Sequence, residues 1–421
     1  ILNSMKMNYW KFAVLAMAVV ALSFTSCSDD GNGGGGDGDE VTLKGDVTST
    51  VTLTANNTYY LDGEYIVKDG GVLRIEPGTK IIAKSEDQTI DFILVEQGGK
   101  IMAEGTAEKP IIMTSETEEP GAWGGLHICG RAPINAGNQK SEVGDAPYGG
   151  NIVNDNSGIL RYVRIEYAGY KFTAEKECNG FTFYGVGNGT TLEYLQAYKG
   201  TDDGFEWFGG TVNAKYLVSY SNSDDAFDWT QGWVGKGQFF VAYQAPQSEF
   251  PLGCDCLIEA DNWDKGFGAT PIACPVLANM TLIGADSEIS EGSDIATQNR
   301  GIRLRAGTQA KLYNTIVTGK TRNLTTETTE TEGFLADGTS VLKYITMAGD
   351  INCKEGIYSS ALFTAAANHN TINATPAFTN KYIGVIDGGE DMSAIDPFFT
   401  KAQYQGAVKA GNDWTTGWTK K

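Results

Sequence analysis

Histidine and basic residues are scarce in this 421-residue chain. His127 and His369 are the only histidines, and neither lies near a pair of cysteines, so the sequence contains no zinc-binding motif. The 32 Lys and Arg stand against 52 Asp and Glu, which gives a formal net charge of −20. This imbalance argues against nucleic acid or an anionic lipid surface as a partner and favours divalent cations and neutral ligands.

No long hydrophobic run follows the N-terminal segment, so no membrane-spanning helix is expected beyond it. Residues 1–26 have a basic flank, an apolar stretch over residues 12–24 and the sequence FTSC ending at Cys27, as a signal peptide does. This arrangement resembles a bacterial lipoprotein signal, which implies lipidation of Cys27; an ordinary secretory signal is the alternative. Residues 27–40 are rich in Gly and Asp and are expected to form a flexible tether. The acids directly after Cys27 resemble the export tag of lipoproteins displayed on the outer face of the outer membrane.

Helical periodicity is almost absent from Val41 onward, where short β-rich runs alternate with Gly, Asn and Asp. The sequence TDDGFEWFGG, which starts at Thr201, recurs 22 residues later as SDDAFDWTQG. A period of this length with several short strands predicts a solenoid, and neither the Leu/Asn spacing of leucine-rich repeats nor the length of a propeller blade fits. The expected fold is all-β: a right-handed parallel β-helix over residues 41–386 with terminal caps.

A β-helix exposes an unpaired strand edge at each end, and each edge needs a cover. We expect residues 41–70 to cap the N-terminal end and residues 387–421, with Phe399 and Trp418 as packing side chains, to cap the C-terminal end. Two irregular stretches rich in turn-forming residues are expected to leave the coil and overhang one face: residues 131–157 and 320–333.

Several blocks, among them GVLRIEPGTKIIAK, GAWGGLHICGRAPIN and GIRLRAGTQAKLYNTIVTG, resemble a family of Bacteroidota surface lipoproteins with a pectate-lyase-like right-handed β-helix. The resemblance covers nearly all of residues 41–421. It implies the fold and a lipid-anchored location on the outer membrane, exposed at the cell surface, but no established activity.

The repeated Asp-Asp pairs are the first candidate site. Asp202 and Asp203 recur as Asp224 and Asp225, so the two pairs should be neighbours on adjacent coils. Two carboxylates about 5 Å apart repel by roughly 1 kcal/mol in water and by several at an effective dielectric near 20. Three interpretations stay open: solvated turn acids that bond nearby backbone amides, a Ca²⁺ site built from hard oxygen ligands, or catalytic carboxylates.

Alternation along the strands distinguishes inward from outward side chains. Aliphatic residues and two Phe/Trp pairs should fill the interior: Val163, Leu195, Leu217, Phe205, Trp207, Phe227 and Trp229. Tyr162, Tyr194 and Tyr216 should then stack outside as a platform for sugar rings, with Glu206 and Asp228 as further outward ligand-binding side chains. The alternative for the tyrosines is that they stabilise coil stacking or lie under an excursion loop.

Six cysteines follow Cys27, an even number that permits disulfides in an exported protein. They are Cys129, Cys178, Cys254, Cys256, Cys274 and Cys353. Spacing does not decide connectivity, and the favoured pair is Cys254 or Cys256 with Cys274.

Enzyme motifs are incomplete. Paired Asp on a β-helix resembles polygalacturonase-type glycosidases, but the Gly-His-Gly and Arg-Ile-Lys motifs of those enzymes are missing. The Arg-x-Pro-x-x-Arg motif of pectate lyases is matched by RAPINA at Arg131 only in its first half. Arg303 and Arg305 point the same way from one expected strand and either bind a carboxylated sugar or form a solvated face.

Three functions therefore compete. The favoured one is a non-catalytic surface lipoprotein that binds or scaffolds polysaccharide, or an outer-membrane protein partner, along one face of the β-helix. The alternatives are a polysaccharide lyase or glycoside hydrolase centred on the four turn acids, and a structural or adhesion protein. Cleavage needs a proton donor as well as a base, so convergence of basic or histidine residues on the acids would distinguish them.

Overall fold

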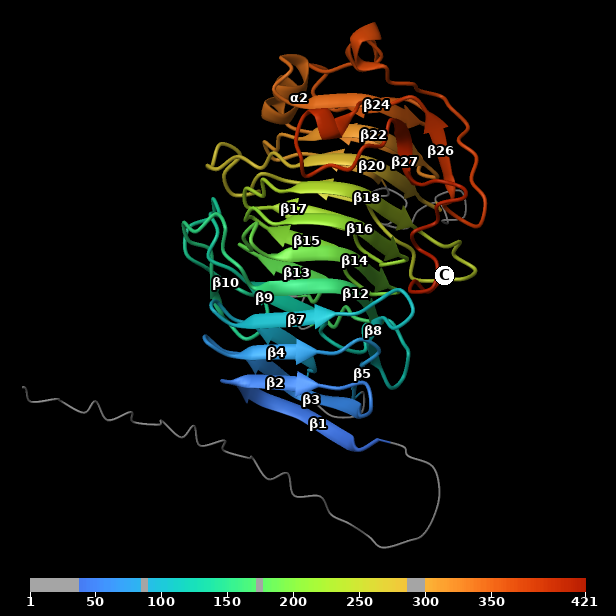
Figure 1. Ribbon diagram of the computed structural model, residues 1–421. Coiled ribbons are helices and arrows are strands. Elements are labelled where there is room, and N and C mark those ends of the chain that lie inside the picture. The colour runs from blue at the N-terminus through green and yellow to red at the C-terminus, as the bar shows by residue number, and fades with distance from the viewer. Residues whose placement is uncertain (1–37, 85–89, 172–176, 286–299) are drawn as a thin grey trace, which may run out of the picture. The chain divides into compact units, whose positions relative to one another are not determined.

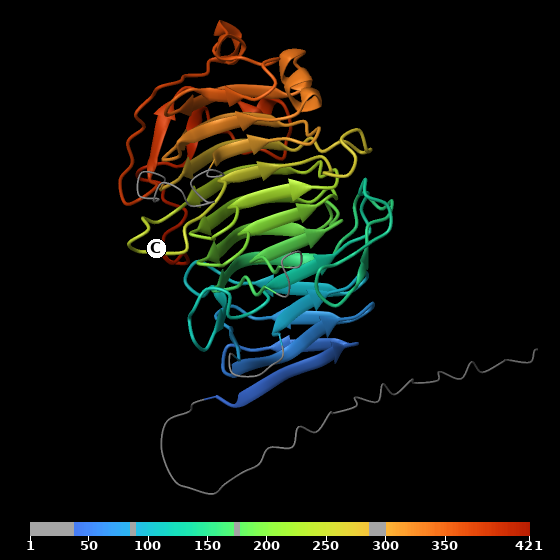
Figure 2. The ribbon, with the colours of Figure 1, turned by 180° about the vertical axis from the view of Figure 1, so that it is seen from behind.

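The structure, a computed structural model, describes residues 38–84, 90–171, 177–285 and 300–421. The unit Gly38–Lys421 is a right-handed parallel β-helix in which 23 strands join one sheet. Figure 1 shows its coils stacked from β1 to β24, and Figure 2 shows the same stack from behind. The expected signal peptide, Cys27 and nearly all of the expected tether lie outside the described residues. The predicted fold class is confirmed.

Each coil contributes strands to three parallel columns. Column 1 continues from the second parts of β1 and β3 and contains β6 (Phe92–Val95), β9 (Leu126–Cys129), β13 (Phe181–Tyr184), β15 (Phe205–Phe208), β17 (Phe227–Thr230), β19 (Ile258–Ala260), β21 (Arg300–Leu304), β23 (Arg322–Thr326) and β25 (Ile351–Cys353).

Columns 2 and 3 are the first and second halves of seven long strands. These are β12 (Gly158–Glu166), β14 (Thr191–Tyr198), β16 (Asn213–Tyr220), β18 (Lys236–Tyr243), β20 (Val276–Ile283), β22 (Lys311–Thr318) and β24 (Val341–Met347). Each long strand bends at one residue in the left-handed region, such as Tyr194 with φ 55° or Phe239 with φ 62°. The bend turns the chain from column 2 into column 3.

The first coils complete the columns at the N-terminal end. Their strands are β1 (Glu40–Val47), β2 (Thr50–Leu53), β3 (Thr58–Val67), β4 (Val72–Ile75), β5 (Lys80–Ala83), β7 (Lys100–Glu104) and β8 (Ile111–Ser115). Because β1 pairs with β3 and β2 with β4 in the same parallel sheet, residues 41–70 are part of the stack. The residues expected to cap the N-terminal end are therefore the first coil of the stack itself.

The 22-residue repeat corresponds to one coil, since Phe205 pairs with Phe227 and Trp207 with Trp229 across β15 and β17. These four side chains are at most 1% exposed and lie in the interior, as predicted. The ring centroids of Phe205 and Phe227 are 5.5 Å apart. Aromatic rings thus stack inside the helix with the period of the coils, and this stacking fixes the register of one coil on the next.

The C-terminal end of the interior is closed by residues that follow the last long strands. Leu335 of α2 (Thr329–Ala336), Tyr358 and Phe363 of α3 (Ser360–Phe363) belong to the central core cluster. Figure 1 places α2 beside β24 at that end of the stack. Among the described residues no helix is both long and apolar enough to cross a membrane.

Residues 387–421, which we call the C-terminal strap, run along the flank of the helix instead of capping its end. β27 (Tyr404–Val408) pairs antiparallel with β26 (Gly384–Asp387) and lies against β18, β20 and β22. Outward side chains of the stack hold the strap: Arg164 binds the carbonyl of Trp418 at 2.6 Å and Gln196 that of Lys420 at 2.7 Å. Further along, Asn279 binds the carbonyl of Tyr404 at 2.6 Å, and Thr346 binds Gln405 at 2.7 Å. The predicted end cap is therefore a lateral brace.

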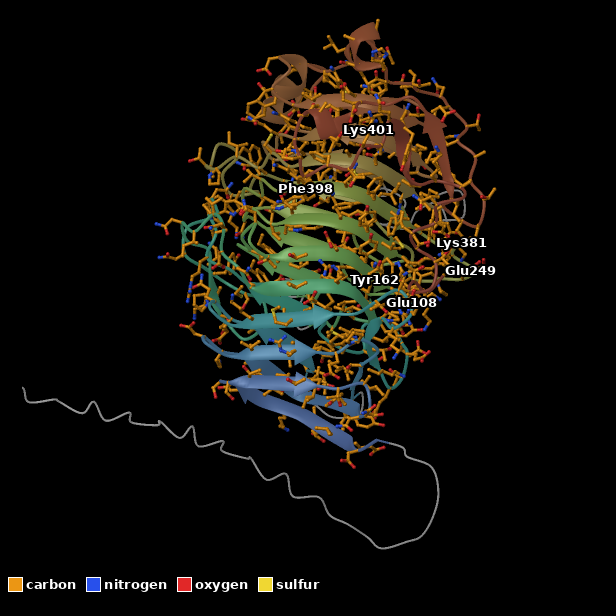
Figure 3. The ribbon with its side chains drawn as sticks, in the orientation of Figure 1. Glu108, Tyr162, Glu249, Lys381, Phe398 and Lys401 are labelled. Atoms are coloured by element: carbon orange, nitrogen blue, oxygen red, sulfur yellow. The ribbon has the colours of Figure 1, made fainter. Side chains whose placement is uncertain are left out.

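Among the described residues, the loops that leave the stack include one that was predicted. Residues 131–157 form an excursion with the hairpin β10 (Gln139–Lys140) and β11 (Pro147–Tyr148), and Tyr148 packs on the outer face of column 1. Residues 320–333 instead contain β23 and the start of α2, so the second predicted excursion was wrong. Residues 244–257 form an excursion that the repeat did not reveal, tied by Glu249 to Lys381 at 3.5 Å (Figure 3).

Candidate functional site

The Asp-Asp pairs occupy the tight turns that lead from column 3 into column 1. Asp202, Asp203 and Asp225 are 7%, 6% and 5% exposed, whereas Asp224 lies at the exposed rim. The turns precede β15 and β17, whose in-register pairing places one turn directly on the other. The four predicted site acids are therefore neighbours on adjacent coils, as the repeat indicated.

The second Asp of each pair binds the backbone of the next coil. Asp203 Oδ1 accepts the amide of Asp225 at 2.9 Å, and Asp225 Oδ1 accepts the amide of Cys256 at 2.6 Å. Upstream, the amide of Asp203 donates to Asn179 Oδ1 at 3.2 Å. One carboxylate oxygen of each of these acids thus has a structural role, because it links successive turns that lack strand pairing of their own.

The first Asp of each pair has no such role. Within the described residues, neither Asp202 nor Asp224 accepts a hydrogen bond through its carboxylate or forms an ion pair. Oxygens of Asp202, Asp203 and Asp224 lie within 4.8 Å of one another. We call these three residues the turn trio; its oxygens could together hold a cation.

A second group of acids begins at Asp203 and continues onto column 1. Oxygens of Asp203, Glu206 and Asp228 also lie within 4.8 Å of one another. Glu206 points outward as predicted, is 8% exposed and accepts a hydrogen bond from Asn179 Nδ2 at 2.6 Å. Asp228 Oδ1 is buried and has no hydrogen-bond partner among the described residues. Five carboxylates are thus joined through Asp203.

Burial and mutual repulsion govern the charge state of these acids. Burial raises the pKa of Asp203 well above its usual value, and the neighbouring charges of Asp202 and Asp225 raise it further. The pKa of Glu206 is raised for the same reason, with Glu142 of the 131–157 excursion and Asp228 as the neighbouring acids. A protein can relieve such a cluster only by protonation, by bound cations or by basic side chains.

In the next coil, basic side chains neutralise the acids. Glu259, the partner of Asp228 in β19, lies 2.6 Å from both Arg303 and Arg305, and Arg305 also binds Asp261 at 2.7 Å. The two arginines are therefore committed to internal ion pairs, and the expectation that they form a solvated face or bind a carboxylated sugar was wrong. Their position one coil further leaves the turn trio without a comparable partner.

No histidine reaches the acids. His127 is fully buried beneath the 131–157 excursion, where Nε2 lies 2.6 Å from the carbonyl oxygen of Gly124 and Nδ1 3.3 Å from the hydroxyl of Tyr184. Burial lowers its pKa to about 4, so it is neutral near pH 7. In the described part of the chain the nearest flexible cation is Lys171, which forms an ion pair with Glu177 while its charge also acts on Asp202.

Sequence reasoning missed a third copy of the acidic turn. CDCLIEA, which contains Asp255 and Glu259, aligns in space with SDDAFDW, because the amide of Asp255 donates to the carbonyl of Asp224. The 244–257 excursion lengthens this coil, so the spacing between Asp228 and Glu259 is 31 residues instead of 22. The repeated acidic sequence was therefore present, but the inserted loop moved it away from the 22-residue spacing.

Comparison with known proteins agrees with this geometry. The family model of the pectate-lyase-like β-helix domain matches residues 45–419. The chain belongs to this family. No curated protein and no solved structure matches the chain.

In this pectate-lyase-like β-helix the tyrosine ladder faces outward, as expected, but it is not an open platform. The rings of Tyr162, Tyr194 and Tyr216 stack with centroids 4.3 Å apart at each step. Trp414 and Trp418 of the C-terminal strap pack edge-on against them and leave the tyrosines half-buried. The strap thus covers the ladder, and the expectation that its faces are free to bind sugar rings needs correction. Figure 3 labels Tyr162 among the outer side chains of the stack.

The six cysteines of the described β-helix are free thiols. Cys254 and Cys256 precede β19 in column 1, whereas Cys274 precedes β20 in column 2. These positions lie on different sides of the same coil, so the predicted pairing of Cys254 or Cys256 with Cys274 was wrong. Aromatic stacking and the coil-to-coil hydrogen bonds take the place of covalent links in this family member.

Proposed function

We propose that this pectate-lyase-like β-helix is an exported, lipid-anchored protein that binds polysaccharide along the outer face of column 1 and does not cleave it. The observation that carries the proposal is a pair of outward, partly exposed acids in cross-strand register on successive coils, Asp228 and Glu259; Glu206 and Thr182 continue the row but are buried. Acids presented by successive coils suit an extended polymer better than a small ligand. Carboxylates accept hydrogen bonds from sugar hydroxyls, so neutral polysaccharides fit this face.

Two features favour binding over cleavage. No histidine converges on Glu206 and Asp228 among the described residues, and Arg305, whose charge acts on Asp228, is paired with Glu259 and Asp261, so a polysaccharide lyase lacks a free base there. The oxygens of Asp203, Glu206 and Asp228 lie within 4.8 Å of one another, which is closer than the about 6.5–9.5 Å between the carboxyl groups of inverting glycosidases. A glycoside hydrolase nevertheless remains the second candidate, because these three carboxylates differ in their hydrogen bonding, as an acid and a base must.

The binding proposal is tested by affinity electrophoresis of the purified chain in gels that contain neutral or acidic polysaccharides, together with an assay for released reducing ends. We expect retardation by a neutral polysaccharide, its loss in Glu206→Gln/Asp228→Asn, and its retention in Glu193→Gln, which changes an acid in column 2. Retardation that survives the double substitution would place the binding face elsewhere. Release of reducing ends by the parent but not by the double variant would establish the hydrolase.

The location is tested separately at Cys27. A Cys27→Ala variant is expected to leave the outer-membrane fraction, because the substitution removes the proposed lipid anchor, and to lose protease accessibility on intact cells. A variant that still fractionates with the outer membrane and is still cleaved on intact cells would contradict the lipid anchor.

A further inference from the structure

We propose that a cleft between column 2 and the C-terminal strap binds one neutral sugar ring, a hydroxylated six-membered ring such as that of a hexose. The cleft has a volume of about 150 Å³ and is walled by residues of β14, of β16 and of the strap. Its polar and aromatic walls come from Thr191, Glu193, Asn213, Lys215 and Phe398. The cleft lies on column 2, so binding there does not depend on the proposed polymer-binding face of column 1.

Lys215 is the side chain that points to a ligand. In strand register Glu193 is its neighbour, but Glu193 pairs with Arg161 of the preceding long strand at 3.0 Å. Within the described residues no carboxylate lies within ion-pair distance of Lys215. Its ammonium lies 4.7 Å from the ring centroid of Phe398 and donates one hydrogen bond, at 3.1 Å, to the hydroxyl of Thr400 in the strap. Two of the three donors of the ammonium are therefore left for a ligand.

The environment of Lys215 makes an added acceptor favourable. The side chain is half-buried, and burial lowers the pKa of Lys215 because the ammonium has lost part of its hydration. Oxygen atoms of a ligand at the ammonium would replace the lost water.

Asn213 and Glu193 add a donor and an acceptor to the same cleft. Asn213 Oδ1 accepts the backbone amide of Lys236 at 2.9 Å, which fixes the orientation of the side-chain amide and leaves Nδ2 as a donor without a partner among the described residues. Arg161 binds Oε2 of Glu193 and leaves Oε1 as an acceptor. A sugar hydroxyl both donates and accepts hydrogen bonds, so a ring with several hydroxyls matches this mixture of groups.

Phe398 and the size of the cleft limit the ligand to one ring. The ring of Phe398, which Figure 3 labels, packs edge-on against the buried ring of Phe399 at a centroid distance of 5.1 Å, and this contact holds it in place. Its apolar face can pack against the C–H groups of a sugar ring. A cavity of roughly 150 Å³ is large enough for benzene, so the cleft takes a single six-membered ring and not a continuous polymer.

Two other classes of ligand fit the cleft less well. A carboxylated sugar or an inorganic anion would meet the carboxylate of Glu193 in the same small space. A purely apolar ring would leave the donors of Lys215 and Asn213 without acceptors, which costs free energy when they are covered. A neutral ring with hydroxyls avoids both penalties.

The test is saturation-transfer-difference NMR of the purified chain with the methyl glycosides of glucose, galactose and mannose, and with glucuronate as an acidic probe. We expect at least one neutral glycoside to bind with a Kd on the order of 1 mM, as a ligand of roughly a dozen non-hydrogen atoms can reach. Glucuronate should bind about fivefold less well, because Glu193 repels its carboxylate. Absence of binding by every neutral glycoside at about 20 mM would overturn the site. Glucuronate that binds as tightly as the neutral sugars would overturn the ligand class.

Lys215→Met is the decisive variant, because methionine keeps the aliphatic packing against Phe398 and removes the ammonium. We expect it to bind the glycoside about tenfold less well while its melting temperature stays near that of the parent. Lys343→Met is the matched control, since Lys343 occupies the same position of column 2 on β24. It should bind the glycoside as the parent does.

Two further variants separate the cleft from the face of column 1. Phe398→Leu, at a partly exposed position, should weaken binding as Lys215→Met does, and it provides a second test if the lysine variant unfolds. Glu206→Gln/Asp228→Asn should bind the glycoside like the parent, even where it no longer binds the polymer. Unchanged binding in either folded cleft variant, or loss of binding in a folded Glu206→Gln/Asp228→Asn variant, would overturn the proposal.

Discussion

His127 links the stability of the β-helix to pH. The ring is fully buried between Leu94 and Thr182 of neighbouring coils, and its contact with the carbonyl of Gly124 assigns the proton to Nε2. The polar groups that face it are the Tyr184 hydroxyl and, through that hydroxyl, Glu142 at 2.9 Å. Protonation of the ring would place an unpaired charge in this site.

The expected change in the free energy of unfolding follows from the shift in the pKa of His127. Burial lowers the pKa of His127 from 6.5 to about 4. Since the folded-state pKa is depressed, the contribution to stability is complete above pH 6.5 and is lost as the pH falls towards 4. A difference of about 2.5 pH units corresponds to about 3 kcal/mol of the free energy of unfolding.

The assay is denaturant unfolding at several pH values between 7.5 and 4.5 for the parent and for His127→Gln. Glutamine keeps a donor for the carbonyl of Gly124 but does not titrate. Because the clustered acids also titrate in this range, the informative quantity is the stability of the parent minus that of His127→Gln, which should fall by about 2.5 kcal/mol between pH 7.5 and pH 4.5. His369→Gln, at an exposed position, is the control and should follow the parent. Parallel profiles for the parent and His127→Gln would refute the reasoning.

Three further predictions concern packing, charge and thiols. Trp418→Ala should lower the free energy of unfolding by about 3–5 kcal/mol, because its indole is fully buried against the tyrosine ladder; an unchanged melting temperature would mean that the C-terminal strap is dispensable. Arg303→Met should cost about 3 kcal/mol in denaturant unfolding, since it leaves Glu259 and Glu327 with fewer cations in a mostly buried network; a stabilised variant would contradict this. Thiol titration in denaturant without reductant should yield six reactive cysteines from the described residues and almost none in the native state; fewer than six in denaturant would reveal a disulfide.

The fold was predictable because one coil repeats as one unit of sequence. The 22-residue spacing of Phe205 and Phe227 is the strand register itself, and alternation around them separated interior rings from outward acids. The contact between the two Asp-Asp pairs followed from the same spacing. Wherever the period held, the sequence therefore indicated both the fold and which candidate residues are neighbours.

The features that could not be predicted depend on contacts between residues that do not recur at a fixed spacing in the sequence. The third acidic turn was hidden by a loop that shifted Glu259 to 31 residues after Asp228. The strap joins Lys420 to Gln196 across 224 residues, and neither residue belongs to a motif. The pairing of Arg305 with Glu259 and Asp261 likewise crosses from one coil to another of unequal length. These contacts determine which candidate residues are available to a ligand. The strap covers the tyrosines, and the two arginines form ion pairs with the acids of the next coil.

The strap also changes how the stack unfolds and when it is complete. Repeat proteins whose units contact only their neighbours can lose terminal units one at a time. Here one segment, the C-terminal strap, contacts both Arg164 on β12 and Thr346 on β24. Coils that are distant in the stack are therefore held by the same segment and should unfold together. Because the strap follows the coils in the sequence, it is synthesised after them, and the tyrosine ladder stays uncovered until residues 404–421 fold back along the stack. Completion of the stack therefore depends on the strap.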